Sequence, residues 1–175
     1  KSLTPFLNKK VLLLGDIMQD VYIYGDIVGE ALDAPVPEIE ERKIQTSLGG
    51  NGLVAANILE LGGNLTFMTV VGKDEDKAFY DAWKHPKLKK LFFIDTTRRN
   101  TVKRRWYADG KKWLQVNKVD NHGISKELEK KISAVLDKEI KKTDVIVIMD
   151  PQHGLLTKSL IAYVLKLSAR YKKPL

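Results

Sequence analysis

Two short apolar runs constrain the fold of this chain more than any other feature. The run from Lys10 to Gly15 reads KVLLLG, and the run from Val145 to Met149 reads VIVIM. Apolar residues without polar alternation over such lengths are typical of strands buried on both faces, which occur in parallel sheets covered by helices. The sequence therefore predicts an α/β fold around a mostly parallel sheet.

The segments between these two runs alternate between strand and helix patterns. Apolar spacing predicts the remaining core elements, which are strands at residues 65–71 and 91–94, a helix at 53–61, and a second helix that follows the acidic start Lys73-Asp74-Glu75-Asp76 and runs to about Trp83. Ser125 and Thr157 are expected to cap two later helices, the second ending near Arg170. Exposed strands are predicted at 21–28 and 36–44, with a hairpin at 101–107 and 113–119 around Asp109-Gly110.

Composition narrows the class of protein. The hydrophobic content of 43% suffices for a core, and the absence of cysteine excludes disulfides and thiolate metal sites. No apolar run approaches the roughly 18 residues of a membrane-spanning helix, and Lys1 to Pro5 do not resemble a secretory signal. A cytoplasmic protein without a membrane partner is expected.

The net charge of +8 favours anionic partners, from phosphorylated metabolites to nucleic acid. The plainer interpretation is that most of the lysines lie on solvated helix and loop faces. No zinc-finger spacing, RNA-binding aromatic motif or helix-turn-helix pattern supports nucleic acid, so this partner is not expected. Charge alone therefore does not choose among the anionic partners.

Acidic residues follow three of the predicted core strands. Asp16 follows the first strand, Asp74 the second and Asp150 the last, and Asp20 lies close behind Asp16. Ligands of open parallel sheets bind at the carboxyl ends of the strands, where carboxylates suit the hydroxyl donors of a sugar. Each aspartate alone can also be explained as a turn cap. The three together favour a ligand site.

Glycines open the helix that begins near Leu53. The segment Gly49-Gly50-Asn51-Gly52 lets the backbone approach a ligand, and the free N–H groups at a helix start offer donors to oxygen. The spacing is neither that of a phosphate-binding P-loop nor that of a dinucleotide-binding fingerprint. A plain loop also uses such glycines, so this signal is weak by itself.

Several motifs taken in order resemble the ribokinase-like (PfkB) sugar kinases, and more narrowly the D-glycero-β-D-manno-heptose 7-phosphate kinases. The resemblance runs from about residue 10 to the end of the chain. The motifs that carry it are Gly15-Asp16-Ile17-Met18-Gln19-Asp20, Tyr24-Gly25-Asp26, Ala34-Pro35-Val36-Pro37, Gly49-Gly50-Asn51-Gly52 with Ala55-Ala56-Asn57, Val70-Val71-Gly72-Lys73-Asp74, Thr101-Val102-Lys103-Arg104-Arg105 and Val119-Asp120.

The resemblance implies a three-layer α/β sandwich with a small β lid, formed by residues 21–44 and 101–119. Residues 1–175 would be the N-terminal portion of a kinase domain that is cut short. The catalytic base, a Gly-Ala-Gly-Asp aspartate, is expected beyond Leu175, together with the main sites for ATP and Mg²⁺. A chain lacking these parts is expected to be inactive by itself, because phosphoryl transfer depends on positioning and charge stabilisation.

The resemblance also assigns substrate-binding residues. Asp20, Gly49, Gly50 and Asn51 would bind sugar hydroxyls, with Asp16 beside them. Lys103 and Arg105 alternate on a predicted strand and therefore point the same way, so the pair is a candidate for holding the phosphate of a sugar phosphate. Ordinary solvated lid charges are the alternative.

The sequence also departs from the family pattern. After Asp150 this chain reads Pro151-Gln152-His153-Gly154, where the heptose kinases tend to carry a lysine. His153 is interpreted as a loop residue rather than a catalyst, and the exact sugar stays open. Two other functions stay open as well, namely a non-catalytic sugar-phosphate-binding or lid-mediated dimerisation module, and a basic nucleic-acid-binding protein.

Overall fold

The computed structural model of the protein describes residues 7–175 and contains two four-stranded sheets. The first sheet is parallel and has the strand order β5-β4-β1-β8. Its strands are β1 (Lys10–Leu14), β4 (Asn64–Val71), β5 (Leu88–Ile94) and β8 (Val145–Ile148). The strands predicted at residues 10–15 and 145–149 are therefore confirmed as neighbours in one parallel sheet. The expected burial on both faces holds for β1, whereas β8 is an edge strand in which only Ile146 is fully buried.

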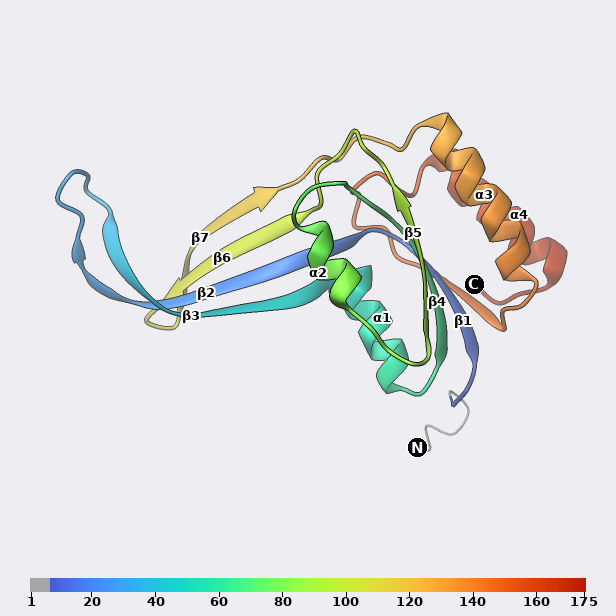
Figure 1. Cartoon of the computed structure of the whole chain (residues 1–175), viewed down its shortest axis with the longest axis horizontal. Helices are drawn as coiled ribbons and strands as arrows, with labels where there is room; N and C mark the ends of the chain where they lie inside the picture. Colours follow the sequence, from blue (N-terminus) through green and yellow to red (C-terminus); the bar gives the residue numbers. More distant parts are fainter. Residues whose placement is uncertain (1–6) are drawn as a thin grey trace.

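Helices cover both faces of this sheet (Figure 1). The helices are α1 (Asn51–Glu60) and α2 (Lys77–Ala82) on one face, and α3 (Lys126–Ile140) and α4 (Lys158–Tyr171) on the other. Alternate residues of β1 divide between two apolar cores: Leu12 and Leu14 pack with α3 and α4, whereas Leu13 packs with α1. This alternation explains why β1 is apolar at consecutive positions, because each face of the strand enters a different core.

The second sheet forms a lid that projects from the end of the first (Figure 1). Its strands are β2 (Ile17–Glu30), β3 (Pro37–Gly50), β6 (Val102–Ala108) and β7 (Lys111–Lys118), in the order β3-β2-β6-β7. Asp109 and Gly110 join β6 to β7 with φ angles of 49° and 74°. Positive φ at both central residues is what a tight hairpin turn requires, and the predicted hairpin is confirmed.

Both predicted helix caps are present. The Ser125 hydroxyl accepts a hydrogen bond from the Leu128 N–H at 3.1 Å, and the Thr157 hydroxyl accepts one from the Leu160 N–H at 3.1 Å. Such caps satisfy backbone donors that have no partner within the helix. They set the first turns of α3 and α4, and the loops that precede these turns lie at the carboxyl end of the sheet.

The lid strands are longer than their sequence patterns indicate. The expected strands at 21–28 and 36–44 extend to residues 17–30 and 37–50, because the polar segment Gln45 to Gly50 pairs antiparallel with Ile17 to Tyr22. Backbone pairing with a long partner strand sustains a segment that lacks apolar alternation. The extension brings Gly49 and Gly50 beside the start of β2. No helix within residues 7–175 combines the length and apolar character needed to cross a bilayer.

Candidate functional site

The candidate site lies where β1 passes into β2, at the carboxyl end of the parallel sheet. Met18 pairs with Gly49 and Ile17 with Gly50, so the end of β3 lies directly beside the start of β2. The Asn51 N–H then donates to the Asp16 carbonyl at 3.0 Å. The structure thus brings together the segments 16–20 and 49–51, which are far apart in the sequence.

Asn51 is fully buried and connects three elements. Its side-chain Nδ2 donates to the carbonyls of Asp16 at 3.1 Å and Met149 at 2.8 Å, so it ties the ends of β1 and β8 to the start of α1. Glycine is required at position 15, because a Cβ there would lie 2.1 Å from this Nδ2. The Asn51 Oδ1 is buried without a hydrogen-bond partner among the described residues. Asn51 therefore shapes the floor of the site.

Asp16 lies beside Asn51 and is only 3% exposed. Its Oδ1 accepts from the Leu155 N–H at 3.2 Å, and its buried Oδ2 has no partner among the described residues. Burial raises the pKa of the Asp16 carboxyl to about 6, against the opposing effects of the Leu155 N–H and the Arg98 charge. The carboxyl of Asp16 is thus an acceptor whose charge changes near neutral pH.

Asp20 forms the wall of the site on β2. Its Oδ1 accepts from the Arg105 Nη1 at 2.7 Å, and both side chains are largely buried, at 15% and 18% exposed. The Arg105 guanidinium also lies 5.3 Å from the centre of the Tyr22 ring, in a cation–π contact. At position 49 only glycine leaves room for this carboxylate, because a Cβ would lie 2.4 Å from the Asp20 Oδ2.

Lys103 and Arg105 lie on the same face of the lid as Asp20. Lys103 pairs with Asp20 across the parallel β2–β6 ladder, and Arg105 pairs with Tyr22 two residues further on. Residues two apart on a strand share a face. Burial is the main cause that lowers the pKa of His153, and the positive charge of Lys103 lowers this pKa further. Of the two lid cations, Lys103 is therefore the one whose charge reaches the β8–α4 loop.

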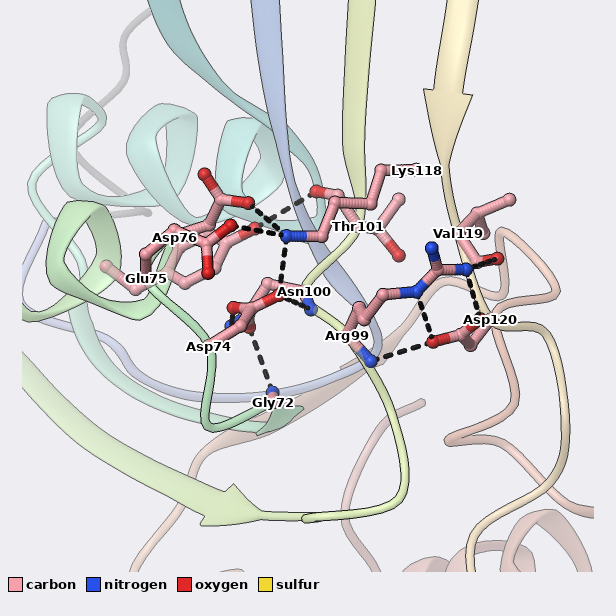
Figure 2. A network of polar contacts seen from close by, with 11 residues as sticks. Gly72, Asp74, Glu75, Asp76, Arg99, Asn100, Thr101, Lys118, Val119 and Asp120 are labelled. Atoms are coloured by element: carbon pink, nitrogen blue, oxygen red, sulfur yellow. Dashed lines mark hydrogen bonds and ion pairs between the residues drawn. The ribbon is translucent and has the colours of Figure 1, made fainter.

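Asp74 does not join this group. Its Oδ2 lies 2.7 Å from the Lys118 Nζ and accepts from the Asn100 N–H at 3.0 Å, at the base of the lid (Figure 2). Burial alone would raise the pKa of Asp74, but the hydrogen bonds from Lys118 and Asn100 outweigh burial and lower it. Asp74 therefore fastens the end of β7 to the turn after β4. Of the aspartates that follow core strands, Asp150 is the one whose charge affects the pKa of Asp16.

The residues near Asp74 do not fit a magnesium ion. Carboxylate oxygens of Asp74, Glu75 and Asp76 lie within 4.8 Å of one another, and they are the one such acidic group within residues 7–175. The Lys118 Nζ lies 2.7 Å from Asp76 and 3.1 Å from Glu75, as well as near Asp74 (Figure 2). The Lys118 ammonium thus occupies the point where the three carboxylates converge, and a cation there would have to displace it.

Replacing Lys118 by methionine is expected to lower the free energy of unfolding at neutral pH by about 1–3 kcal/mol, because Asp74 and Asp76 lose a shared cationic partner. The pKa of Asp74 is depressed in the folded state, so this stabilisation exists above the ordinary carboxyl pKa and is lost as the pH falls through the folded value. Urea unfolding at about pH 7 and about pH 3 measures the deficit, which should shrink at the lower pH. Two results would contradict this role. One is a loss of unfolding free energy that is the same at both pH values, and the other is an equal loss in Lys111→Met, whose lysine is exposed.

Two residues near the site have no distinct signal in the sequence. Arg98 belongs to a basic cluster that is expected to be solvated, yet its side chain is only 6% exposed. His153 lies in the β8–α4 loop, as predicted, with its Nδ1 2.7 Å from the Asn121 Oδ1 and its buried Nε2 unpaired among the described residues. Neither spacing nor periodicity reveals such burial, because loops from three separate segments create it.

A groove of about 400 Å³ lies at the opposite end of the sheet. It is lined by the amino ends of the strands and by lysines that include Lys89 and Lys142. Both of these lysines pair with Glu139, at 2.7 Å and 3.5 Å. Parallel sheets bind ligands at the carboxyl ends of their strands, so we place the site at Asp16 and Asp20 and not in this groove.

Comparison with solved structures identifies the fold. A carbohydrate kinase from Agrobacterium tumefaciens matches 95% of this chain with a TM-score of 0.66 and 19% identity, and the chain covers 52% of that protein. A possible 1-phosphofructokinase from Thermotoga maritima matches 93% of the chain with a TM-score of 0.71 and 13% identity, and the chain again covers 52% of it. The fold is that of the ribokinase-like carbohydrate kinases, and the predicted α/β sandwich with a β lid is confirmed.

Sequence comparison finds relatives among bifunctional HldE proteins. No protein-family model matches the chain. The bifunctional protein HldE of Nitratiruptor sp. is 28% identical over 163 residues, which are 93% of this chain and 35% of that protein. HldE of Pelobacter propionicus is 30% identical over 171 residues, which are 94% of this chain and again 35% of that protein. The predicted resemblance is confirmed, and the chain spans about a third of these relatives' length and about half that of the solved kinases.

Proposed function

We propose that this chain is the sugar-binding half and lid of an ATP-dependent carbohydrate kinase, the N-terminal portion of its kinase domain, and that heptose 7-phosphate is the sugar it binds. The single observation that carries the proposal is the shared face of Asp20, Lys103 and Arg105 above the carboxyl end of the sheet. This face combines a carboxylate acceptor for hydroxyls with two cations for a phosphate.

The sugar hydroxyls would bind between the floor and the wall of the site. Asp20 offers the carboxylate oxygen that Arg105 does not use, and charged acceptors form the stronger hydrogen bonds with hydroxyl donors. The Asp16 Oδ2 and Asn51 Oδ1 are buried acceptors without partners among the described residues. Buried polar atoms are nearly always hydrogen-bonded, so unpaired acceptors gathered in one place support a polar ligand there.

The phosphate of the sugar would bind to Lys103 and Arg105. A guanidinium carries five N–H donors, and Asp20 accepts from one of its nitrogens, which leaves donors for a second anion. The planar fork of Arg105 suits two phosphate oxygens, and Lys103 adds a point charge beside it. Asp20 and the phosphate would then share Arg105, which couples recognition of the hydroxyls to recognition of the phosphate.

Phosphoryl transfer requires groups that this site does not supply. Asp16 and Asp20 serve the sugar in this proposal, and Asp74 and Asp76 at the lid base are ion-paired with Lys118. ATP, Mg²⁺ and the aspartate base would be held by the complementary half of the kinase. The chain by itself would bind the sugar phosphate without transferring a phosphoryl group.

Replacing Arg105 by alanine tests the phosphate role. Binding of heptose 7-phosphate is expected to weaken by about 10–100-fold, since a hydrogen bond to a charged group contributes about 1.5–3 kcal/mol. The unphosphorylated heptose should lose much less, and isothermal titration of both sugars measures the difference. Arg104→Ala is the matched control, because Arg104 lies on the same strand and its side chain points to the opposite face. Equal losses for both sugars would rule out a phosphate role for Arg105.

The opposite face of the lid favours a second copy of the chain as a partner. Ile44, Leu114 and Val116 are 54%, 52% and 45% exposed there. Exposed apolar side chains gathered on one sheet face are typical of interaction surfaces. A homodimer through the lid stays a prediction, which sedimentation analysis over a range of concentrations tests. No observation favours nucleic acid as the partner, and a cytoplasmic location likewise stays a prediction.

A further inference from the structure

Arg98 is a buried arginine at the carboxyl end of the sheet, in the loop between β5 and β6. Its side chain is 6% exposed, and its Nε donates to the Asp95 Oδ2 at 2.8 Å. Asp95 is held in turn, because its Oδ1 accepts from the Thr97 N–H at 3.0 Å and from the Thr97 hydroxyl at 2.6 Å. The guanidinium therefore has a fixed orientation, with Nη1 and Nη2 directed away from Asp95.

These two nitrogens hold two other loops. The Arg98 Nη1 donates to the His153 carbonyl at 3.0 Å, in the β8–α4 loop. The Arg98 Nη2 donates to the His122 carbonyl at 3.0 Å, in the segment between β7 and α3. One side chain thus joins three loops at the edge of the sheet where the sugar site lies. A lysine cannot reproduce this arrangement, because it lacks the planar fork.

The β8–α4 loop needs such support, because its backbone conformation is unusual. Gln152 and Gly154 both have positive φ angles, of 63° and 98°, and His153 lies between them. A non-glycine residue in the left-handed region persists only where its surroundings hold it. Leu155, which follows Gly154, donates its N–H to the Asp16 Oδ1 at 3.2 Å. The position of the His153 carbonyl is therefore connected directly to the orientation of the Asp16 carboxyl.

We propose that Arg98 is a positioning residue for the sugar site. By holding the carbonyls of His153 and His122, it fixes the loop whose Leu155 N–H orients Asp16, and it thereby sets the direction in which Asp16 faces the sugar. Arg98 itself touches no sugar atom. This role rests on the proposed function, since it assumes that Asp16 serves a bound sugar.

The charged groups around Asp16 define what the pH profile of binding should show. Arg98 faces it from the β5–β6 loop, and Asp150 together with the N–H groups of His153 and Leu155 faces it from the β8–α4 loop. Binding of the unphosphorylated heptose, which has no titrating group in this range, should rise as the pH passes through about 6, where the Asp16 carboxyl ionises. Both N–H groups favour the charged carboxylate. If they move away, the pH midpoint of sugar binding shifts upward.

The Arg98→Lys variant of the full chain tests this role, because it keeps the charge and removes the fork. Arg99→Lys is the matched control, since Arg99 is the next residue and forms an exposed ion pair with Asp120. In Arg98→Lys, amide hydrogen exchange in the segment 152–155 should become at least about tenfold faster while α1 is unchanged. Binding of heptose 7-phosphate should weaken by about tenfold or more, and the pH midpoint for binding of the unphosphorylated heptose should move upward. The control should alter none of these quantities.

The outcomes separate this inference from the proposed function. Unchanged exchange in the segment 152–155, or an unmoved pH midpoint of binding, would overturn the positioning role even if the protein became less stable. Failure of the wild-type chain to bind heptose 7-phosphate would instead overturn the proposed function, and the sugar role of Arg98 with it. If Arg98→Lys does not fold, Asp95→Asn weakens the anchor of Arg98 more gently and should give the same changes at smaller size.

Discussion

Replacing Asp20 by asparagine is expected to weaken binding of heptose 7-phosphate by about a hundredfold. Each hydrogen bond from a sugar hydroxyl to the carboxylate contributes about 1.5–3 kcal/mol when the acceptor is charged. Asparagine has nearly the same shape but no charge, so the loss reports the carboxylate itself. Asparagine also leaves Arg105 without the anion that now lies 2.7 Å from it. Isothermal titration with the sugar phosphate measures the change.

Asp26→Asn is the matched control for this substitution. Asp26 lies on the same strand as Asp20 and pairs with Arg42 at 2.8 Å, but both side chains are more than half exposed. Exposed ion pairs contribute little, so sugar binding and stability should both stay within error of the wild type. If Asp20→Asn and Asp26→Asn bound the sugar phosphate equally well, Asp20 would have no place in the site.

Replacing Gly49 by alanine is expected to weaken binding of the sugar phosphate at least tenfold while the protein stays folded. The new Cβ would lie 2.4 Å from the Asp20 Oδ2 and 2.8 Å from both the Asp20 Cγ and the Met18 Cγ, so these two side chains must shift. Moving the carboxylate relieves the clash and spoils its alignment, and misplacement by about 1 Å can cost a hundredfold. Circular dichroism and titration of the same sample measure folding and binding together.

Gly29→Ala is the control, because it measures how a glycine-to-alanine change on a lid strand affects folding and affinity by itself. Gly29 also lies on a lid strand, and a Cβ there meets nothing within 4 Å. Its substitution should change neither the fold nor the affinity for the sugar phosphate. If Gly49→Ala bound the sugar phosphate as well as Gly29→Ala does, the close approach of Gly49 to Asp20 would have no functional meaning.

The order of the core elements could be predicted from the sequence because burial leaves a direct signal there. The apolar run at residues 10–15 and the capping residues Ser125 and Thr157 each act locally, so neighbouring residues suffice to identify them. The full length of β3 could not be predicted, since its polar half is held by backbone pairing to β2. Such pairing depends on a partner strand and not on the side chains of the segment itself.

The segments of the site could be placed together for a similar reason. Strand ends in a parallel sheet meet at one edge, which explains the position of Asp16, whereas the family resemblance grouped it with the glycines at 49 and 50, and antiparallel pairing of β2 with β3 brings them together. The ion pair of Asp20 with Arg105 could not be predicted, because 85 residues separate the two and only the parallel β2–β6 ladder joins them. Arg98 was equally hidden, because a buried and a solvated arginine look alike in a sequence.

Asp74 shows how the strand-end rule can also mislead. It follows a core strand as Asp16 does, yet its carboxylate turns toward Lys118 and Asn100 at the base of the lid (Figure 2). Position along the sequence gives the end of the strand but not the direction of the side chain after it. The partner that decides this direction lies on β7, and no local pattern relates the two residues.

A phosphorylated sugar is expected to bind between the carboxyl end of the parallel sheet and the polar face of the lid. Titration of the ¹⁵N-labelled chain with heptose 7-phosphate, followed by amide chemical shifts, tests this most directly. Saturable shifts are expected mainly in the segments 16–20, 49–51, 103–105 and 150–155. Shifts centred on the lysine-lined groove at the amino ends of the strands, or no saturable shifts at all, would contradict it.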